Sequence, residues 1–216
     1  MNVKKGDAFY AIGEYFDASN EYKKAYSRTP TKEKAKRGER AWKMAECYRR
    51  INYTAKALGA YQNAVRYHYP DSMSLFYLAQ MQHKQGEYKQ AQKNYQLFLD
   101  SVPDSERARL GLQGAMQATQ WKEHPTLYTV KKMALFNSRR ADFSPVLYGD
   151  DWDEIVFSTT RQQVTGDETS GITGTKSGDF FHSKLDEKGQ WTQPEKLEGE
   201  VNTEFDEGAC CLSPDG

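Results

Sequence analysis

The chain has 216 residues, with 30 Lys and Arg against 30 Asp and Glu, so its formal net charge is zero. This length suits two domains of about 100 residues each. Balanced charge disfavours nucleic-acid binding through bulk electrostatics, and the apolar runs are far shorter than the roughly 20 residues that span a bilayer. We therefore expect no nucleic-acid partner and no direct membrane insertion by these residues.

A pattern of small and aromatic residues recurs along the first half of the chain. Tyr61 and Tyr95 are 34 residues apart, and each follows an alanine by four residues. Tyr22 stands in the same frame, between Ala18 and Ala25. A 34-residue period with small residues at fixed places is typical of the tetratricopeptide repeat, a helix-turn-helix unit. Such repeats stack into an α-solenoid with a concave binding surface.

The repeat frame predicts three helix pairs followed by a final helix. The pairs are expected at about 2–11 with 15–27, 37–50 with 54–67, and 72–84 with 88–100. Gly13, Asn52 and Gly86 fall in the turns, where glycine and asparagine tolerate a positive φ. The charged insertion at 31–36 is expected to lengthen the start of the third helix. Asp104 or Ser105 can cap the final helix, which should reach about residue 118.

The first helix of each pair lines the concave side in this kind of repeat. The frame therefore predicts a groove that binds a protein or peptide partner. The predicted groove residues are Asp7, Tyr10, Trp42, Glu46, Arg49, Arg50, Met73, Phe76, Gln80, His83 and Lys84. The alternatives are a groove filled by a neighbouring domain, a groove filled by water, and docking through the convex face or the ends of the stack.

The composition changes near Trp121 from alanine and long charged residues to glycine, threonine, serine, aspartate and aromatics. We expect a helical repeat domain at 1–120, a linker at 121–136 and a β domain at 137–216. Strands are expected near 143–148, 154–160, 179–185 and 190–193, in one antiparallel sheet, with a hairpin turn at 186–189. Asp142 and Asp206 begin similar segments 64 residues apart. This recurrence predicts the beginning of a β-propeller, with about one blade and the first strand of the next blade.

The motifs that suggest chemistry are weak. Lys176 follows Thr175 rather than a glycine, so residues 174–177 do not form a phosphate-binding P-loop, and we expect a solvated loop at about 164–178. The acidic residues of 150–154 lack the glycine and distal glutamate of an EF-hand, so an exposed turn is the simpler interpretation, with calcium binding the alternative. The four histidines are scattered. We predict no catalytic residue, no metal site, no cofactor and no enzymatic activity.

The three cysteines have no metal-ligand spacing. Cys47 is expected to be a buried small apolar side chain in a helix. Cys210 and Cys211 are adjacent, and a bridge between neighbours on a strand would be strained. If the protein is periplasmic, we expect one of them to pair with a cysteine after Gly216.

The order of modules resembles one known family. Asp206 followed by an apolar segment and Ser213-Pro-Asp-Gly resembles the start of a WD40-like PD40 propeller repeat, and Glu154-Ile-Val-Phe-Ser-Thr-Thr-Arg161 resembles its second strand. After a tetratricopeptide array, this order is similar to the TPR/PD40/OmpA-like proteins of Bacteroidota, the PorE type of the type IX secretion and gliding machinery. The sequence lacks a lipoprotein cysteine near its start and an OmpA-like module, so we interpret it as an N-terminal fragment.

The resemblance implies an outer-membrane-associated periplasmic scaffold that binds protein partners in the cell envelope. Peptidoglycan would be bound only through an OmpA-like domain, which these residues do not include. The alternatives are a periplasmic module that senses peptides or carbohydrates, and a propeller enzyme whose site lies in the remaining blades. Saturable binding of a small ligand by the isolated chain would favour the sensor over the scaffold.

Overall fold

The structure of the protein is a computed structural model that describes residues 2–124 and 126–213. The chain divides into two compact units, one formed by residues 1–128 with 171–173 and the other by residues 129–170 with 174–216. The first unit is helical and the second contains a β-sheet. Each unit is described separately.

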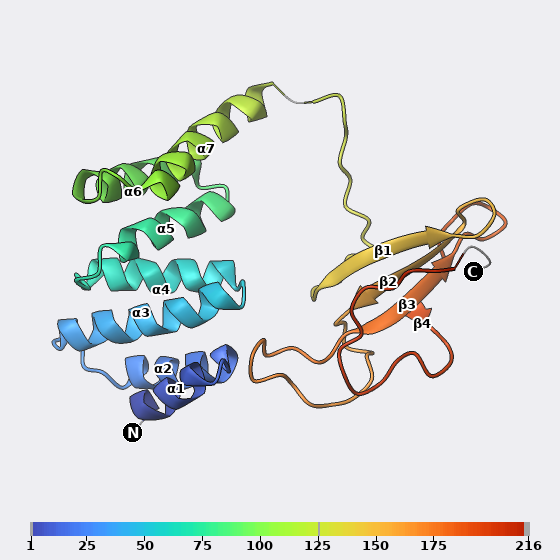
Figure 1. The fold of residues 1–216 in the computed structure, drawn as a ribbon, viewed down its shortest axis with the longest axis horizontal. Helices are drawn as coiled ribbons and strands as arrows, with labels where there is room; N and C mark the ends of the chain where they lie inside the picture. The colour runs from blue at the N-terminus through green and yellow to red at the C-terminus, as the bar shows by residue number, and fades with distance from the viewer. Residues whose placement is uncertain (1, 125, 214–216) are drawn as a thin grey trace. The chain divides into compact units, whose positions relative to one another are not determined.

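The helical unit contains seven helices within its described residues, and Figure 1 shows them stacked in chain order. The arrangement is a solenoid like that of tetratricopeptide repeats, which confirms the predicted helix pairs. The helices are α1 (Asn2–Ala11), α2 (Tyr15–Ser27), α3 (Lys34–Arg50), α4 (Thr54–Arg66), α5 (Met73–Lys84), α6 (Tyr88–Ser101) and α7 (Glu106–Glu123).

The ends of the helices follow local sequence signals. Gly13, Asn52 and Gly86 have φ values of 85°, 57° and 77°, as their places in the turns predict. The Ser105 side chain accepts a hydrogen bond from the backbone N–H of Ala108 and so caps α7. The charged insertion extends α3 back to Lys34, and α7 continues beyond the predicted end at residue 118.

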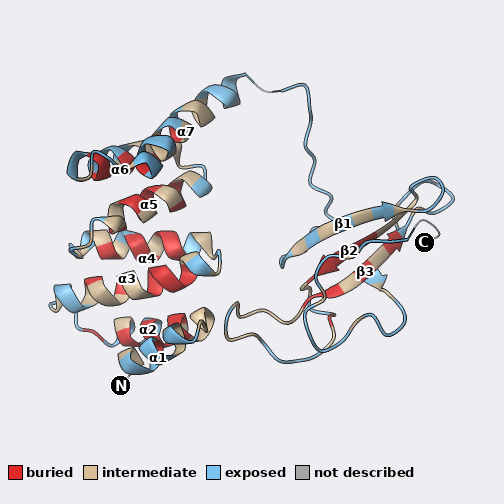
Figure 2. Ribbon diagram, viewed as in Figure 1, coloured by how far each residue is buried: buried red, intermediate tan, exposed pale blue. Residues whose placement is uncertain are grey.

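The core of the solenoid contains large tyrosines together with many alanines. Figure 2 shows the buried residues of α2 to α6 in red. Tyr22 and Tyr61 are almost fully buried, and Ala45 packs in the same cluster. Gly6 of α1 is buried because the Tyr22 ring occupies the space where a side chain would be: an added Cβ would lie 2.7 Å from that ring. A ring of this size gives close contact between helices only where its neighbour is small.

Replacing Gly6 with alanine should therefore destabilise the solenoid, by about 1–3 kcal/mol, because the methyl group and the buried Tyr22 ring cannot occupy the same space. Thermal unfolding followed by circular dichroism measures the change.

The matched control is Gly59→Ala in the middle of α4, where an added Cβ meets nothing within 4 Å. This variant should gain about 0.5–1 kcal/mol, since alanine has the better helix propensity. Equal effects of the two substitutions would show that Tyr22 does not limit the space at Gly6.

The second unit contains one four-stranded antiparallel sheet with the order β1-β2-β3-β4. Its strands are β1 (Asp142–Tyr148), β2 (Glu154–Thr159), β3 (Asp179–Lys184) and β4 (Glu195–Lys196). The first three lie within one residue of their predicted places. The prediction of a fourth strand at 190–193 is wrong, because β4 forms after Pro194. Trp191 makes only an isolated bridge to Leu185, and the centroids of its ring and the Phe136 ring are 5.5 Å apart.

The sheet packs on a small core of aromatic residues. Phe136, Phe157, Val164 and Phe181 are buried together, with Trp191 against them. Val164 was expected to begin a solvated loop, but its apolar side chain joins this cluster. The predicted turn at 186–189 is confirmed, because the Gly189 N–H donates to the Asp186 carbonyl at 2.8 Å.

A polar network joins the start of β1 to the end of β2. The Asp142 carboxylate accepts hydrogen bonds from the Ser138 N–H and the Thr159 hydroxyl, each at 2.6 Å, and from Arg161 at 3.2 Å. Arg161 also donates to the Phe136 carbonyl. Burial raises the pKa of Asp142, but these hydrogen bonds outweigh it and hold the pKa below its usual value.

The edge strand β1 is irregular. Its pairing with β2 shifts register between Phe143 and Val146, where Ser144 has a φ of 50° and Pro145 offers no N–H. The segment after Asp206, which the sequence predicts to enter a strand at 210–212, forms no strand in the described residues up to Ser213. It attaches instead through Glu207, whose N–H donates to the Gly178 carbonyl, and through a hydrogen bond from the Ser158 hydroxyl to the Gly208 carbonyl.

Candidate partner-binding site

The centre of the predicted groove is a cluster of aromatic rings on α3, α4 and α5. The Trp42 ring stacks on Tyr69 with centroids 5.3 Å apart, and meets Tyr61 at 5.6 Å and Tyr77 at 6.1 Å. Tyr61 is fully buried, whereas the other three rings are partly exposed. Trp42 therefore has the combination of a fixed position and an accessible edge that suits contact with a partner.

Arginine side chains lie over this aromatic surface. The Arg49 guanidinium is 4.1 Å from the centroid of the Tyr77 ring, and the Arg50 guanidinium is 5.1 Å from that of Tyr10. Such stacking fixes the planar cation and leaves its remaining donors available. Arg50 is exposed and Arg49 partly so. We call Tyr10, Trp42, Arg49, Arg50 and Tyr77 the aromatic–arginine surface.

Glu46 forms ion pairs with both arginines. Glu46 as a whole is 8% exposed. Its carboxylate is 2.8 Å from the Arg49 guanidinium and 2.5 Å from that of Arg50, and it accepts a hydrogen bond from the Tyr61 hydroxyl. Burial raises the pKa of Glu46, but the hydrogen bonds from Arg49, Tyr61 and Arg50 outweigh it and hold the pKa below its usual value. Glu46 therefore positions the arginines and has little surface to offer a partner.

At the α1 end of the predicted groove, the charges are paired with each other. The Asp7 carboxylate lies 2.7 Å from the Lys43 ammonium and accepts a hydrogen bond of 2.8 Å from the Tyr22 hydroxyl. Asp7 is exposed and Tyr10 half-buried. This end links α1 to α3 through one ion pair, so Asp7 is already engaged when a partner arrives.

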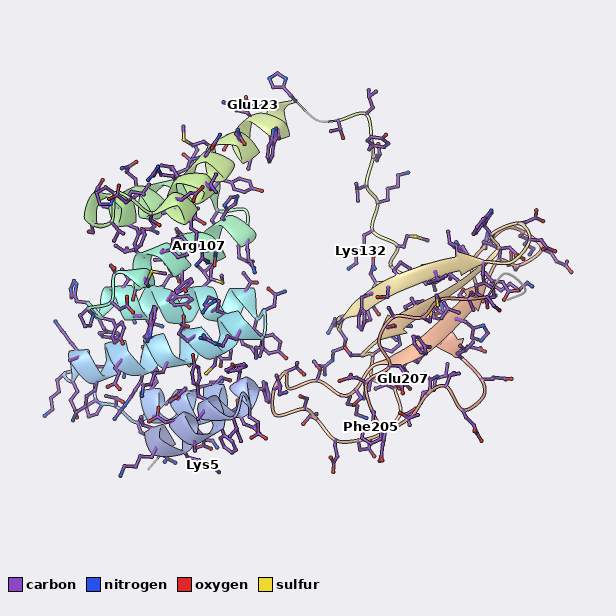
Figure 3. The ribbon with its side chains drawn as sticks, viewed as in Figure 1. Lys5, Arg107, Glu123, Lys132, Phe205 and Glu207 are labelled. Carbon is purple, nitrogen blue, oxygen red and sulfur yellow. The ribbon has the colours of Figure 1, made fainter. Side chains whose placement is uncertain are left out.

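At the other end, one predicted groove residue is placed wrongly by the sequence. Phe76 is only 2% exposed, because its ring packs against Tyr95 and Phe98 in the core of α5 and α6. Arg107 of α7, labelled in Figure 3, covers it further, with its guanidinium 5.2 Å from the ring centroid. Phe76 supports the surface but cannot contact a partner without moving.

The remaining predicted residues of repeat three are spread along α5. Met73, Gln80 and His83 are partly buried and Lys84 is exposed, where its ammonium donates to the Asn52 side chain at 3.1 Å. The His83 ring meets the Tyr95 ring edge-on at 6.3 Å. The structure thus brings together the predicted residues of α1 and α3, while Phe76 and His83 of α5 contact Tyr95 of α6.

The sequence missed three residues of this region: Tyr69, Tyr77 and Arg107. Tyr77 follows the predicted Phe76 on α5. The repeat frame predicts that Phe76 faces outward, but Tyr77 is the partly exposed residue and Phe76 is buried. Tyr69 lies in the turn between α4 and α5, outside the frame's first helices. The high density of aromatic residues between 61 and 77 could have indicated the two tyrosines, but it gives no signal for Arg107.

Other candidate sites hold no comparable geometry. Within the described residues no three His, Cys, Asp or Glu side chains gather as a metal site would require. Residues 174–177 lie in a connection between two strands, not before a helix. Burial raises the pKa of the Cys47 thiol to about 12. Cys210 and Cys211 are free among the described residues, and a partner after Gly216 lies outside them.

A family comparison matches part of the helical unit. Residues 73–105 match the model of the tetratricopeptide repeat. This range covers α5, α6 and the turn that follows, and its geometry is repeated in the earlier helix pairs. The helical unit is therefore a tetratricopeptide-type solenoid. No curated protein sequence matches the chain, and none of the described helices has the length and apolar character needed to cross a bilayer.

Several solved structures resemble part of the chain. The first TPR of Spaghetti (RPAP3), bound to the HSP90 peptide SRMEEVD, is 20% identical with a TM-score of 0.47, covering 55% of this chain and 90% of that one. MamA is 19% identical with a TM-score of 0.48, covering 56% and 68%. The Sgt2 TPR domain from Aspergillus fumigatus is 20% identical with a TM-score of 0.46, covering 62% and 88%.

Replacing Glu46 with glutamine should destabilise the helical unit by about 3 kcal/mol at pH 7, because it leaves two arginines around a neutral side chain. The Glu46 pKa is lower in the folded chain than its ordinary value of 4.5. The stabilisation is therefore complete above pH 4.5 and is lost as the pH falls through the lower folded pKa. Thermal unfolding at pH 7 and at pH 3 should show the difference between wild type and variant shrinking in acid.

The control is Glu39→Gln on the same helix, whose carboxylate is half-exposed and 3.5 Å from Lys43. Its effect should be within about 0.5 kcal/mol at either pH. A Glu46 variant that behaves like the Glu39 variant would contradict the assigned role of the buried carboxylate.

Proposed function

We propose that the chain is a non-enzymatic scaffold that binds a protein partner through the aromatic–arginine surface. The observation that carries the proposal is the placement of Arg49 and Arg50 over tyrosine rings beside the partly exposed Trp42. Tryptophan, tyrosine and arginine are the residues that most often dominate the free energy of protein–protein contacts. A rigid cluster of this kind loses little conformational entropy on binding.

The β unit is proposed to be one blade of a PD40-type propeller. Its four strands pair antiparallel in chain order, which is the topology of a blade. The Asp142 network at the start of the sheet supports the assignment, because it fixes the entry of the chain into β1. Asp206, the predicted counterpart, has a different partner: it accepts a hydrogen bond from the Gly178 N–H at 2.7 Å.

With these two modules, the proposed setting is a cell-envelope complex in the periplasm, associated with the outer membrane and with type IX secretion and gliding. The support for this setting is the order of the modules and the resemblance of residues 154–161 and 206–216 to PD40 repeats. Attachment to peptidoglycan would require an OmpA-like domain outside these residues.

The binding proposal is tested by the double substitution Trp42→Ala and Arg50→Ala, with capture of partners from envelope extract and a binding titration of the captured protein. The affinity should fall roughly 30-fold, since losing a contact at the centre of an interface costs about 2 kcal/mol or more. Circular dichroism should show an unchanged helix content.

The matched control is Trp121→Ala with Arg109→Ala, which removes an exposed residue of each type from α7. This variant should bind like wild type. If the Trp42 and Arg50 variant also binds like wild type, the partner uses another surface.

The proposed setting has its own test, which is fractionation of the native cells and measurement of type IX secretion after deletion of the gene. The protein should appear with the outer membrane, and secretion should be lost. A protein found in the cytosolic fraction, or unchanged secretion, would contradict the setting without affecting the binding proposal.

A further inference from the structure

A second surface of the helical unit concentrates positive charge. Between residues 23 and 40 the chain has eight basic and two acidic residues, although its net charge is zero. This stretch comprises the end of α2, the turn after it and the first half of α3. The positive charge therefore belongs to one local region of the solenoid and not to the protein as a whole.

Two arginines of this region, Arg37 and Arg40, donate hydrogen bonds to neutral groups. Arg37 donates to the Thr29 carbonyl at 2.6 Å and to the Tyr67 hydroxyl at 3.1 Å, and Arg40 donates to the Ala25 carbonyl and the Thr29 hydroxyl. Among the ion pairs of the described residues, none includes Arg37, Arg40 or Lys34. Within residues 2–124 and 126–213, no carboxylate forms an ion pair with these three side chains.

Beside these charges lies a cleft of about 500 Å³ between the start of α3 and the turn that joins α4 to α5. Lys34, Lys36 and His68 provide its basic lining, and Tyr67, Tyr69 and Pro70 its apolar lining. Glu39 is the one carboxylate among the lining residues. The cleft has the size of a small ligand pocket, so it fits one or two side chains of a peptide.

Contacts with neighbouring side chains fix the positions of the tyrosines that form the walls of the cleft. Arg37 lies between two rings, with its guanidinium 4.2 Å from the Tyr26 centroid and 5.3 Å from that of Tyr67. Tyr69 stacks on Trp42 with an interplanar angle of 19°. His68, between the two tyrosines, has a φ of 53°, a conformation that costs energy for a residue other than glycine. The cleft is thus built before any ligand binds.

We propose that this cleft docks an acidic peptide segment that carries an aromatic or large apolar side chain. The inference rests on the proposed function, because it assigns the segment to the protein partner of the scaffold. A carboxylate of the segment pairs with Lys34 at the rim, a second competes with Glu33 for the Lys36 ammonium, and the apolar side chain packs on Tyr67 and Tyr69. Charge complementarity with the surplus of basic residues between 23 and 40 selects the acidic ligand.

The geometry favours a peptide over the other anionic partners. The flat surface of a bilayer cannot reach tyrosines inside a cleft. A nucleic-acid backbone brings a continuous run of phosphates, whereas the lining has few basic side chains beside an apolar wall, so it suits a single acidic group next to an apolar side chain. A peptide therefore matches both the basic rim and the mixed interior.

The test measures fluorescence anisotropy of a labelled Glu-Glu-Phe-Glu-Glu peptide titrated with the full chain. Wild type should bind it saturably at one site, and Lys34→Glu with Lys36→Glu should weaken binding about tenfold or more, because repulsion replaces attraction at the rim. Replacing the phenylalanine of the peptide with alanine should also weaken binding. The control Lys89→Glu with Lys93→Glu changes two exposed lysines of α6 by the same charge and should bind like wild type.

Three results would overturn the inference. Equal weakening in the Lys89 and Lys93 control would mean that the peptide responds to net charge alone. Binding to phosphatidylglycerol vesicles that needs Lys34 and Lys36, with no binding of the peptide, would assign the cleft to a lipid surface. Self-association of the chain that disappears in the Lys34 and Lys36 variant, again without peptide binding, would assign it to a second copy.

The same variants separate this inference from the proposed function. Arg50→Ala should weaken capture of the envelope partner and leave the peptide titration unchanged, because Arg50 lies at the far end of α3 from Lys34. If the Lys34 and Lys36 variant captures the partner at wild-type affinity while Arg50→Ala does not, the scaffold function stands and the docking cleft is contradicted.

Discussion

The structure depends on the space that small residues leave for tyrosine rings. Tyr22 fills the place of a side chain at Gly6, Tyr61 is buried in the same cluster as Ala45, and Tyr95 is buried with Ala79. Each pairing brings the two helices of a repeat close together. Because the rings are rigid, they also set the angle at which one helix meets the next. The packing thereby allows Tyr10 of α1 and Tyr77 of α5 to contact Arg50 and Arg49 of α3, and these residues form the surface that we propose binds a partner.

The buried carboxylate of Glu46 connects the packed core to the aromatic–arginine surface, because it contacts both Tyr61 and the two arginines. An arginine on a mobile side chain would lose conformational entropy on binding, but Arg49 and Arg50 are already held by Glu46 and by the rings of Tyr77 and Tyr10. The electrostatic cost of burying the carboxylate is offset by two cations and by the Tyr61 hydroxyl. Core and surface are therefore coupled through one residue, and a change at Glu46 acts on both.

The sequence predicts the helices well because their signal is local and repeated. The 34-residue period places six helices within a few residues, and Ser105 marks the start of the seventh. The exposure of Phe76 is not predictable in this way, since it depends on how Tyr95 and Phe98 fill the space beneath it. β4 was misplaced because Trp191 has the character of a strand residue but packs in the core of the β unit. The basic cleft joins residues about 30 positions apart, and only the fold shows that they meet.

The bulge in β1 limits how the β unit can be recognised. A regular edge strand offers a row of N–H and carbonyl groups to which another chain can add. In β1 the register shift, the left-handed Ser144 and the missing N–H of Pro145 interrupt that row near its middle. An incoming strand would find its ladder of hydrogen bonds broken after the first residues. A partner at this edge would therefore have to contact side chains such as the exposed Phe143 and Leu147. The interrupted row also makes the sheet resistant to the uncontrolled strand pairing that leads to aggregation.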